Sequence, residues 1–195
     1  MKKILIASEN SHKIGEFRNL FGGGFEVHSL NDYNFSEKLP SEGDVSYEEN
    51  ANVKARYVGE RLGMLTLGDD SGFEVDALHG EPGIHSARFM GTGDSVLQRR
   101  EILRRLKGQS NRKARFVCVL AAYDPILKRS QYFRGEVNGK VSDLERGTRG
   151  FGYDPIFIPD EGDGKTFAEM SDSDKNRISH RSQAVALFRD FLKGS

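Results

Sequence analysis

The chain has 195 residues, with 29 basic and 29 acidic side chains, so its formal net charge is zero. Zero net charge argues against a protein that binds nucleic acid, because such proteins normally carry a basic surplus. A hydrophobic fraction of 36% is too high for a disordered chain, and the length favours one compact domain with room for two lobes. We therefore expect residues 1–195 to form a single domain that does not bind nucleic acid directly.

The chain contains one cysteine, Cys118, so it can form neither an internal disulfide nor a cysteine-rich zinc site. Its longest apolar run, Phe116–Tyr123, is far shorter than the ~18 residues that a membrane-spanning helix needs. The apolar stretch Ile4–Ala7 is too short for a signal peptide. We expect a cytoplasmic protein that has no membrane segment, with Cys118 in its core.

In the first half of the chain, short apolar stretches alternate with helical patterns. Strands are expected at Lys2–Ala7, Phe25–Ser29 and Met64–Leu67, and helices at Lys13–Leu20 and Ser46–Leu62. Ser46 and Glu49 have the spacing of a capping box, and Gly63 lies where a helix stop is expected. The third strand leads into Asp69-Asp70-Ser71-Gly72, which we interpret as a strand end before a further strand at Phe73–Leu78.

The second half continues the same alternation of strands and helices. The expected elements are a helix that follows Asp94 and runs to Leu106, paired strands at Arg115–Ala122 and Ser130–Val137, a short strand at Pro155–Ile158, a helical turn at Asp174–Ile178 and a closing helix at Ser179–Lys193. A glycine-rich loop at Gly147–Asp154 precedes the short strand. Interleaved strands and helices predict an α/β fold with a mixed sheet.

The first candidate binding segment, residues 8–13, leaves a strand and opens a helix. Free backbone N–H groups and the dipole at a helix start attract anions such as phosphate. Ser8 and Asn10 can donate further hydrogen bonds, and Lys13 adds a positive charge. The other members of the segment are Glu9, Ser11 and His12. The alternative is an ordinary capped loop, since the glycines of a Walker A motif are absent.

The second candidate is a cluster of carboxylates at the end of an apolar strand. Asp69 and Asp70 are adjacent, so their charges repel unless a divalent cation or strong donors compensate them. Glu42, in the loop before the second helix, can supply a third carboxylate. Mg²⁺ prefers one or two carboxylates together with phosphate oxygens and water. A turn that faces solvent is the alternative interpretation.

The third candidate, Gly150–Pro155, alternates glycines with the aromatic residues Phe151 and Tyr153 before the carboxylate of Asp154. Glycine allows a flat ligand to approach the backbone, and an aromatic face can stack on a base. The alternative is a turn that packs both aromatic rings into the core. These residues therefore indicate either a base-binding loop or a structural one.

The fourth candidate, at the start of the last helix, is rich in hydrogen-bond donors. His180 and Arg181 can recognise a carbonyl-bearing ring, and Lys175 can reach a base or a phosphate. A solvated helix start is the alternative. On the second helix, Asn50 and Lys54 share one face, which is either part of a binding site or simply exposed. We interpret the basic cluster that runs from Arg99 to Lys107 as a solvated helix face.

Taken together, these segments resemble the inosine triphosphate pyrophosphatase family over nearly the whole chain. The motifs that carry the resemblance are, in chain order, Ser8-x-Asn10-x-x-Lys13, Glu49-Asn50-Ala51 with Lys54, Asp69-Asp70-Ser71-Gly72, Pro82-Gly83, Phe151-Gly152-Tyr153-Asp154-Pro155 and Ser179-His180-Arg181. Ser8 stands where Thr is also usual, and Glu9 where a small residue is common. Neither departure disturbs the expected chemistry.

The resemblance implies an elongated mixed β-sheet with flanking helices, and two lobes around a central nucleotide-binding cleft. It implies a homodimer that needs Mg²⁺ and hydrolyses ITP, dITP and XTP to the nucleoside monophosphate and pyrophosphate. Asp70 takes the place of the catalytic base, and Glu42, Asp69 and Asp70 that of the metal cluster. The residues that match phosphate- and sugar-side contacts are Ser8, Glu9, Asn10, Ser11, His12, Lys13, Lys54 and Ser71. The residues that match base-side contacts are Phe151, Gly152, Tyr153, Asp154, Lys175, His180 and Arg181.

Two other functions share part of this pattern. A related pyrophosphatase for pyrimidine or methylated nucleotides would share the phosphate and metal chemistry but not the Phe-Gly-Tyr-Asp and Ser-His-Arg segments. A non-catalytic nucleotide-binding module would have no use for Glu42, Asp69 and Asp70 beside phosphates. Pyrophosphate release in the presence and absence of magnesium separates these possibilities.

Overall fold

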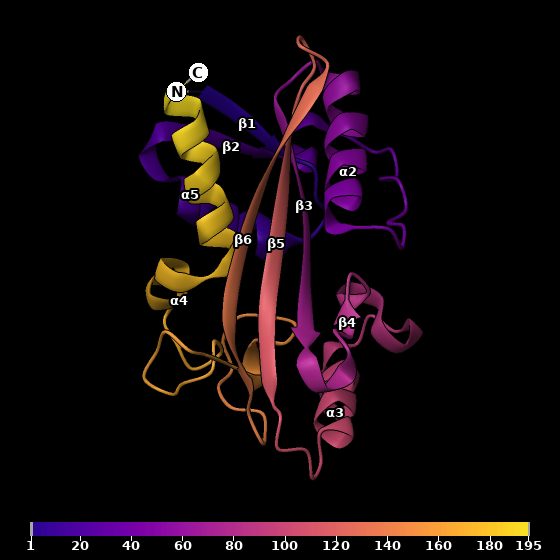
Figure 1. Cartoon of the computed structure of the whole chain (residues 1–195). Coiled ribbons are helices and arrows are strands. Elements are labelled where there is room, and N and C mark those ends of the chain that lie inside the picture. Colours follow the sequence, from indigo (N-terminus) through magenta and orange to yellow (C-terminus); the bar gives the residue numbers. More distant parts are fainter. Residues whose placement is uncertain (1, 195) are drawn as a thin grey trace. The chain divides into compact units, whose positions relative to one another are not determined.

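The computed structural model describes residues 2–194, whose strands form one sheet in the order β2-β1-β3-β5-β6-β7, with β4 paired to β3 (Figure 1). The strands are β1 Lys2–Ile6, β2 Phe25–Ser29, β3 Thr66–Val75, β4 Pro82–Gly83, β5 Lys113–Asp124, β6 Arg129–Val141 and β7 Phe157–Pro159. The α-helices are α1 Ser11–Phe21, α2 Tyr47–Leu62, α3 Ser95–Arg105, α4 Asp172–Ile178 and α5 His180–Lys193. β1 pairs in parallel with β2 and β3, whereas β3–β4 and β6–β7 are antiparallel. The predicted α/β fold with a mixed sheet is therefore confirmed.

The chain divides into two compact units that are built from separate stretches of sequence. Unit 1 comprises residues 1–70, 118–134 and 183–195, and unit 2 comprises residues 71–117 and 135–182. Each unit is described by itself, and two lobes around a central cleft stay a prediction. None of the helices formed by residues 2–194 has the length and apolar character needed to cross a bilayer.

In unit 1, the alternation of side chains along β1 assigns helices to both faces of the sheet. Ile4 and Ile6 pack with Phe17 of α1 and with the α5 residues Ala184 and Phe188. Leu5 and Ala7 point the other way and pack with Val58 of α2. Successive strand residues face opposite sides of a sheet, so α1 and α5 cover one face and α2 covers the other.

The helix starts follow the capping residues in the sequence. The side chain of Asn10 accepts hydrogen bonds from the first turn of α1, and Ser46 caps α2 in the same way. Asp94 caps α3, as predicted. Gly63 ends α2 in the left-handed conformation that glycine adopts without strain.

The structure corrects one prediction about the sheet. Asp69-Asp70-Ser71-Gly72 is not a strand end but the middle of β3, which runs without interruption from Thr66 to Val75. Gly68 explains how the strand accommodates this path, because a Cβ atom there would collide with the carbonyl oxygen of Ala51 in α2. The missing side chain lets α2 lie directly against the strand, one residue before the two aspartates.

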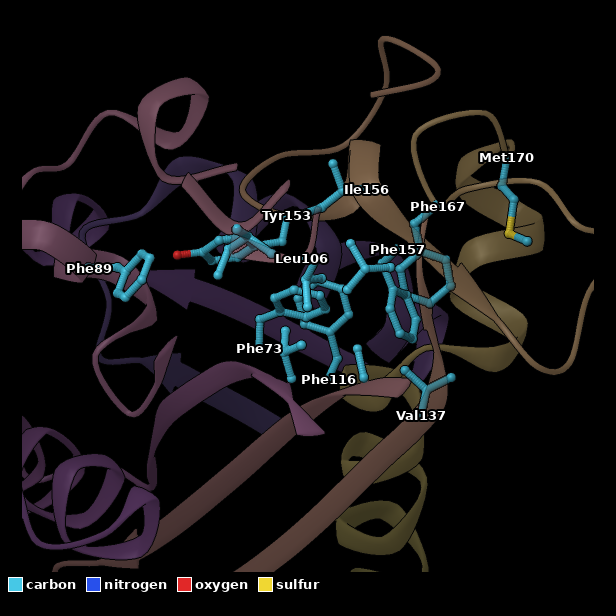
Figure 2. Packing of buried hydrophobic residues seen from close by; sticks show 14 residues of the cluster. Phe73, Phe89, Leu106, Phe116, Val137, Tyr153, Ile156, Phe157, Phe167 and Met170 are labelled. Atoms are coloured by element: carbon cyan, nitrogen blue, oxygen red, sulfur yellow. The ribbon is translucent and has the colours of Figure 1, made fainter. Parts of the chain in front are cut away.

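The core of unit 2 is a cluster of aromatic rings (Figure 2). The ring of Phe73 lies 4.9 Å from that of Phe116 and 4.9 Å from that of Tyr153, with the latter pair stacked at 17°. Phe157 meets Phe116 edge to face, with their centroids 4.9 Å apart. Such aromatic pairs add specific geometry to apolar burial, and they give this unit a rigid base for the residues around it.

Candidate active site

Asp69 lies in unit 1 on the face of the sheet that α1 covers. Its side chain is 1% exposed and forms an ion pair with the ammonium group of Lys13 in α1. The thiol of Cys118 in β5 donates a hydrogen bond to Asp69 Oδ1 over 3.1 Å. A buried carboxylate is stable only when such partners compensate its charge, and α1 and β5 together supply these partners.

Asp70 points to the opposite face, toward α2, because it follows Asp69 directly in an extended strand. It is 3% exposed, and Asn50 Nδ2 donates a hydrogen bond to its Oδ2 over 3.0 Å. The other amide atom, Asn50 Oδ1, accepts from the backbone N–H of Gly43 at 2.7 Å. Asn50 therefore links Asp70 to the loop that carries Glu42.

Lys54, one turn after Asn50 on α2, places its ammonium group among the oxygens of this face. Its Nζ atom lies 2.6 Å from Glu42 Oε1, 2.7 Å from the backbone carbonyl oxygen of Asp69 and 4.0 Å from Asp70 Oδ1. The Lys54 side chain itself is buried. The ammonium group of Lys54 therefore lies between the carboxylates of Glu42 and Asp70.

The three carboxylates of the predicted metal cluster, Glu42, Asp69 and Asp70, have different partners in the structure. Within residues 2–194, no group of three or more His, Cys, Asp or Glu side chains is arranged to hold a metal ion. Asp69 and Asp70 are consecutive in an unbroken strand, so their side chains diverge to different partners. Glu42 and Asp70 are the two carboxylates that share a neighbourhood, around the ammonium group of Lys54.

Burial raises the pKa of Asp70 from its usual value of 3.8 to about 6. The positive charge of Lys54 acts in the opposite direction, and the negative charge of Glu42 adds to the increase. A carboxyl group with a pKa of about 6 is mostly ionised at neutral pH and is a better proton acceptor than an exposed aspartate. Perturbed carboxyl groups of this kind cluster at catalytic sites.

The first candidate segment, residues 8–13, is the turn between β1 and α1. Asn10 Oδ1 accepts hydrogen bonds from the backbone N–H groups of His12 and Lys13, at 3.0 and 3.2 Å. Ser8 Oγ accepts one from the N–H of Asn10. Two of the N–H groups expected to face an anion thus already donate to Asn10 within the segment. The positive charge that the segment offers to an anion comes from Lys13. The exposed members are Glu9, Asn10, Ser11 and His12.

In unit 2, the third candidate segment meets the fourth through Asp154 and Lys175. Both side chains are buried, and Lys175 Nζ lies 2.7 Å from Asp154 Oδ2. The same carboxylate oxygen accepts the backbone N–H of Phe151 at 2.9 Å. Lys175 Nζ lies 5.2 Å from the centroid of the Phe151 ring, which is half-buried. The structure therefore groups these three residues.

Arg181 and His180 belong to the same region of unit 2. Arg181 is 1% exposed, its Nη2 atom donates to Ser71 Oγ over 3.1 Å, and its guanidinium carbon lies 5.9 Å from the Phe151 centroid. The His180 ring stacks on Phe116 with centroids 4.8 Å apart. A guanidinium group keeps its charge and its five N–H donors even when it is buried this deeply next to an aromatic ring.

Tyr153 has a different position from the one predicted for a base-stacking ring. It is 4% exposed, its ring is stacked on Phe73, and its hydroxyl group donates to the carbonyl oxygen of Ser86 over 2.9 Å. Figure 2 shows its hydroxyl oxygen pointing toward the side of the cluster on which Phe89 lies. Tyr153 is thus a core residue that anchors the glycine-rich loop, whereas Phe151 and the neighbouring Gly152 remain half-buried.

For three residues, the structure shows a contact or a degree of burial that sequence reasoning did not predict. Asn50 was identified only as one member of a helix face, and Cys118 was interpreted as an ordinary core residue. Arg99 was expected on a solvated surface, yet it is buried. The i, i+4 spacing already placed Asn50 on the same face as Lys54, but it did not identify Asp70 as the partner of Asn50. No sequence signal distinguishes Arg99 from the exposed Arg100 beside it.

Solved structures share this architecture over the full chain. The structure of the Staphylococcus aureus Ham1 protein superposes with a TM-score of 0.86 at 37% identity and covers 99% of each chain. A HAM1 protein from Coxiella burnetii gives a TM-score of 0.84 at 31% identity over 100% of each chain. The α/β fold with its curled mixed sheet is thus one that other proteins of this kind adopt.

Sequence comparison leads to the same group of proteins. A relative from Porphyromonas gingivalis, named dITP/XTP pyrophosphatase, is 41% identical over 98% of both chains. Another of that name, from Symbiobacterium thermophilum, is 43% identical over 95% of this chain and 92% of its own. The family model described as the Ham1 family matches residues 4–191. The resemblance that the motifs indicated is therefore confirmed, and the chain belongs to the Ham1 family.

Proposed function

We propose that this protein is a pyrophosphatase that hydrolyses non-standard purine nucleoside triphosphates, namely ITP, dITP and XTP. The products are the nucleoside monophosphate and pyrophosphate, so deaminated purines are kept out of DNA and RNA. The observation that carries the proposal is the pair of buried aspartates in β3, each matched by a different lysine. Such an arrangement combines a proton acceptor with cationic groups for a triphosphate, which phosphoanhydride hydrolysis requires. The names of the relatives support dITP and XTP among these substrates.

Magnesium is the proposed cofactor, and the oxygen donors around Lys54 fit it. Glu42 and Asp70 present hard carboxylate oxygens that lie around the Lys54 ammonium group. These two residues would hold the ion, whereas the Asp69 carboxylate is committed to Lys13 and Cys118. A bound Mg²⁺ would neutralise phosphate charge that develops during the reaction.

The protein's own residues supply the remaining steps. Asp70 accepts the proton of the attacking water, and Asn50 orients its carboxylate by the hydrogen bond to Oδ2. Lys13 and Lys54 attract the negatively charged triphosphate. The turn from Ser8 to Lys13 approaches the phosphates with exposed polar side chains. These roles follow from burial, charge and hydrogen-bonding capacity together.

The residues grouped in unit 2 are proposed to recognise the purine. Arg181 and Lys175 are donors without acceptor capacity, so they match the 6-oxo group of hypoxanthine or xanthine and not the amino group of adenine. Phe151 offers a half-buried ring for stacking, and the His180 ring is held against Phe116. Asp154 holds the Lys175 ammonium group in place. The selectivity for deaminated purines would arise from these contacts.

The decisive experiment is a measurement of pyrophosphate release over a panel of nucleoside triphosphates, with and without MgCl₂. We expect rapid release from ITP, dITP and XTP, slow release from ATP and GTP, and none in EDTA. A preference for pyrimidine or methylated nucleotides would favour the related pyrophosphatase instead. Tight nucleotide binding without release would favour a non-catalytic module.

Arg181→Ala is expected to reduce the preference for ITP over ATP. A lost hydrogen bond to a buried carbonyl group typically costs ~1–3 kcal/mol, which corresponds to roughly 5- to 150-fold in kcat/KM for 6-oxo substrates. ATP hydrolysis should change much less. The matched control is Arg177→Ala, which removes an exposed arginine from the preceding helix. Equal losses for ITP and ATP in the Arg181 variant would argue for a structural or phosphate-side role.

A homodimer in the cytoplasm is the proposed state of the enzyme, as the motif resemblance implies. Phe89 is 7% exposed and belongs to the core of unit 2, whereas the adjacent Met90 is 54% exposed and can contribute to an apolar contact. Light scattering at micromolar concentration should give the mass of two chains. The mass of a single chain under these conditions would reject the dimer.

A further inference from the structure

Arg99 of α3 is buried in unit 2, although it lies within a basic run that looks like a solvated helix face. It is 8% exposed, while Arg100 is exposed. Its Nε and Nη2 atoms both donate to Glu145 Oε2, at 3.0 and 2.9 Å. Its Nη1 atom donates to the backbone carbonyl oxygen of Gly152 over 2.8 Å. A guanidinium group keeps its charge, so burial at this position requires all of these acceptors.

The contact with Gly152 is informative because this residue lies within the loop proposed to recognise the purine. Gly150 and Gly152 have φ angles of +70° and +59°, so the backbone on both sides of Phe151 is in the left-handed region. No regular secondary structure covers these residues. Glycines at both positions leave the loop intrinsically mobile unless contacts from outside fix it.

Two contacts fix this loop from opposite sides. Asp154 accepts the N–H of Phe151 and pairs with Lys175, and its carboxylate packs against Gly150 so closely that a Cβ there would collide with it. Arg99 holds the carbonyl group of Gly152. The Phe151 ring, between these anchors, lies 5.2 Å from the Lys175 ammonium group. An unbroken series of contacts therefore runs from Glu145 through Arg99 and Gly152 to the base-side residues.

We infer that Arg99 is a positioning residue for purine discrimination: it sets the conformation of the loop at residues 150–154 and thereby the orientation of Phe151. The inference rests on the proposed function, because it assigns the loop to base recognition. Arg99 acts through the loop and not on the phosphates, since its contacts are Glu145, Gly152 and Ser95. Loss of Arg99 should therefore impair the step that distinguishes purines and leave the triphosphate-binding residues unchanged.

The test compares Arg99→Met with Arg100→Met, a matched loss of charge one residue away on the exposed side of α3. We expect the Arg99 variant to raise the KM for ITP and to lower the ITP-to-ATP ratio of kcat/KM by roughly tenfold or more, as for a lost hydrogen bond to a charged group. Inhibition by inorganic tripolyphosphate, which has no base, should stay at the wild-type level. The Arg100 variant should match wild type in both measurements.

Two further variants guard against loss of folding, which circular dichroism and thermal melting will detect. Arg99→Lys keeps the charge but replaces the planar fork with a point charge, and Glu145→Gln keeps the shape but weakens the ion pair. Both should give intermediate ITP-to-ATP ratios. Ratios equal to wild type in the folded variants would overturn the inference, as would tripolyphosphate inhibition that weakens in parallel. If wild-type protein shows no preference for ITP, the proposed function fails, and this inference fails with it.

Discussion

Asp70→Asn is expected to lower kcat for pyrophosphate release from ITP by about 10²–10⁴-fold, the usual contribution of a positioned base. The substitution keeps the shape of the side chain, and its Oδ1 atom can still accept the hydrogen bond from Asn50. Nucleotide binding should persist because Lys13, Lys54 and the base-side residues are unchanged. Asp69→Asn, on the other face of the strand, provides a comparison that perturbs the partner of Lys13 instead. Steady-state kinetics over a range of magnesium concentrations measures both variants.

The same substitution should make the metal-free fold more stable at neutral pH. The pKa of Asp70 is about 6 in the folded protein, compared with 3.8 for a carboxyl group that is not buried. Folding therefore favours the protonated form of Asp70. The contribution of Asp70 to the stability of the wild-type fold is therefore fully present below pH 4 and is lost as the pH rises through 6. A difference of about two pKa units corresponds to about 3 kcal/mol, which Asn would recover above pH 6 and not below pH 4.

Urea unfolding of wild type and Asp70→Asn in EDTA at pH 3.5 and pH 8 measures this effect. A folded variant that retains more than about a tenth of wild-type kcat would reject Asp70 as the base, because a base supplies at least about 10²-fold. Glu42 would then be the next carboxylate to test. Equal stability of the two proteins at pH 8 would contradict the burial penalty on Asp70.

Lys54→Met is expected to destabilise the fold by about 3–5 kcal/mol, the usual result of removing one partner from a buried ion pair. Methionine fills much of the volume but leaves Glu42 Oε1 and the carbonyl oxygen of Asp69 without their common donor. Loss of the Lys54 charge also removes an influence that lowers the pKa of Asp70, so this pKa should rise further above 6. The midpoint of chemical denaturation at pH 7 gives the change in the free energy of unfolding.

Lys107→Met is the control, since Lys107 is exposed and its removal should change stability by less than about 0.5 kcal/mol. The double variant Lys54→Met with Glu42→Gln should regain part of the lost stability, because it also removes the negative charge that the Lys54 ammonium group compensated. A destabilisation below about 1 kcal/mol in the single variant would show that solvent screens Lys54 more than its burial indicates.

Local signals in the sequence were sufficient to place most helices. Ser46 and Asp94 start α2 and α3 in the structure because their side chains satisfy N–H groups that the first turn leaves open. Gly63 ends α2 for an equally local reason, its positive φ angle. Elements whose ends depend on such short-range chemistry can be predicted from the residues alone.

The path of β3 could not be predicted in the same way. Glycines and aspartates at residues 68–72 are typical of a turn, but tertiary contacts keep this segment extended. Asn50, Lys54, Lys13 and Cys118 all approach it from elements distant in sequence. These partners compensate two adjacent charges that local propensity alone would direct to solvent.

Burial of individual side chains was the other feature that escaped prediction. Tyr153 and Phe151 stand in the same glycine-rich motif, yet one ring belongs to the aromatic core and the other stays half-buried. Arg99 and Arg100 are adjacent and identical, and they differ only in which side of α3 they occupy. Composition cannot separate such pairs, because the difference arises from what the rest of the fold places beside them.

Asp69 and Asp70 are adjacent in β3, but their side chains contact different helices, so substitutions on each helix act first on a different aspartate. Variation in α1 or at Cys118 acts on Asp69, whereas variation at Asn50 of α2 acts on Asp70. Variants of α1 and variants of α2 can therefore be selected in separate libraries, and the selected substitutions can then be combined. Lys54 bridges the two sides, because it donates to the carbonyl oxygen of Asp69 and lies 4.0 Å from Asp70 Oδ1, so improvements chosen on the two sides should add only where they leave Lys54 unchanged.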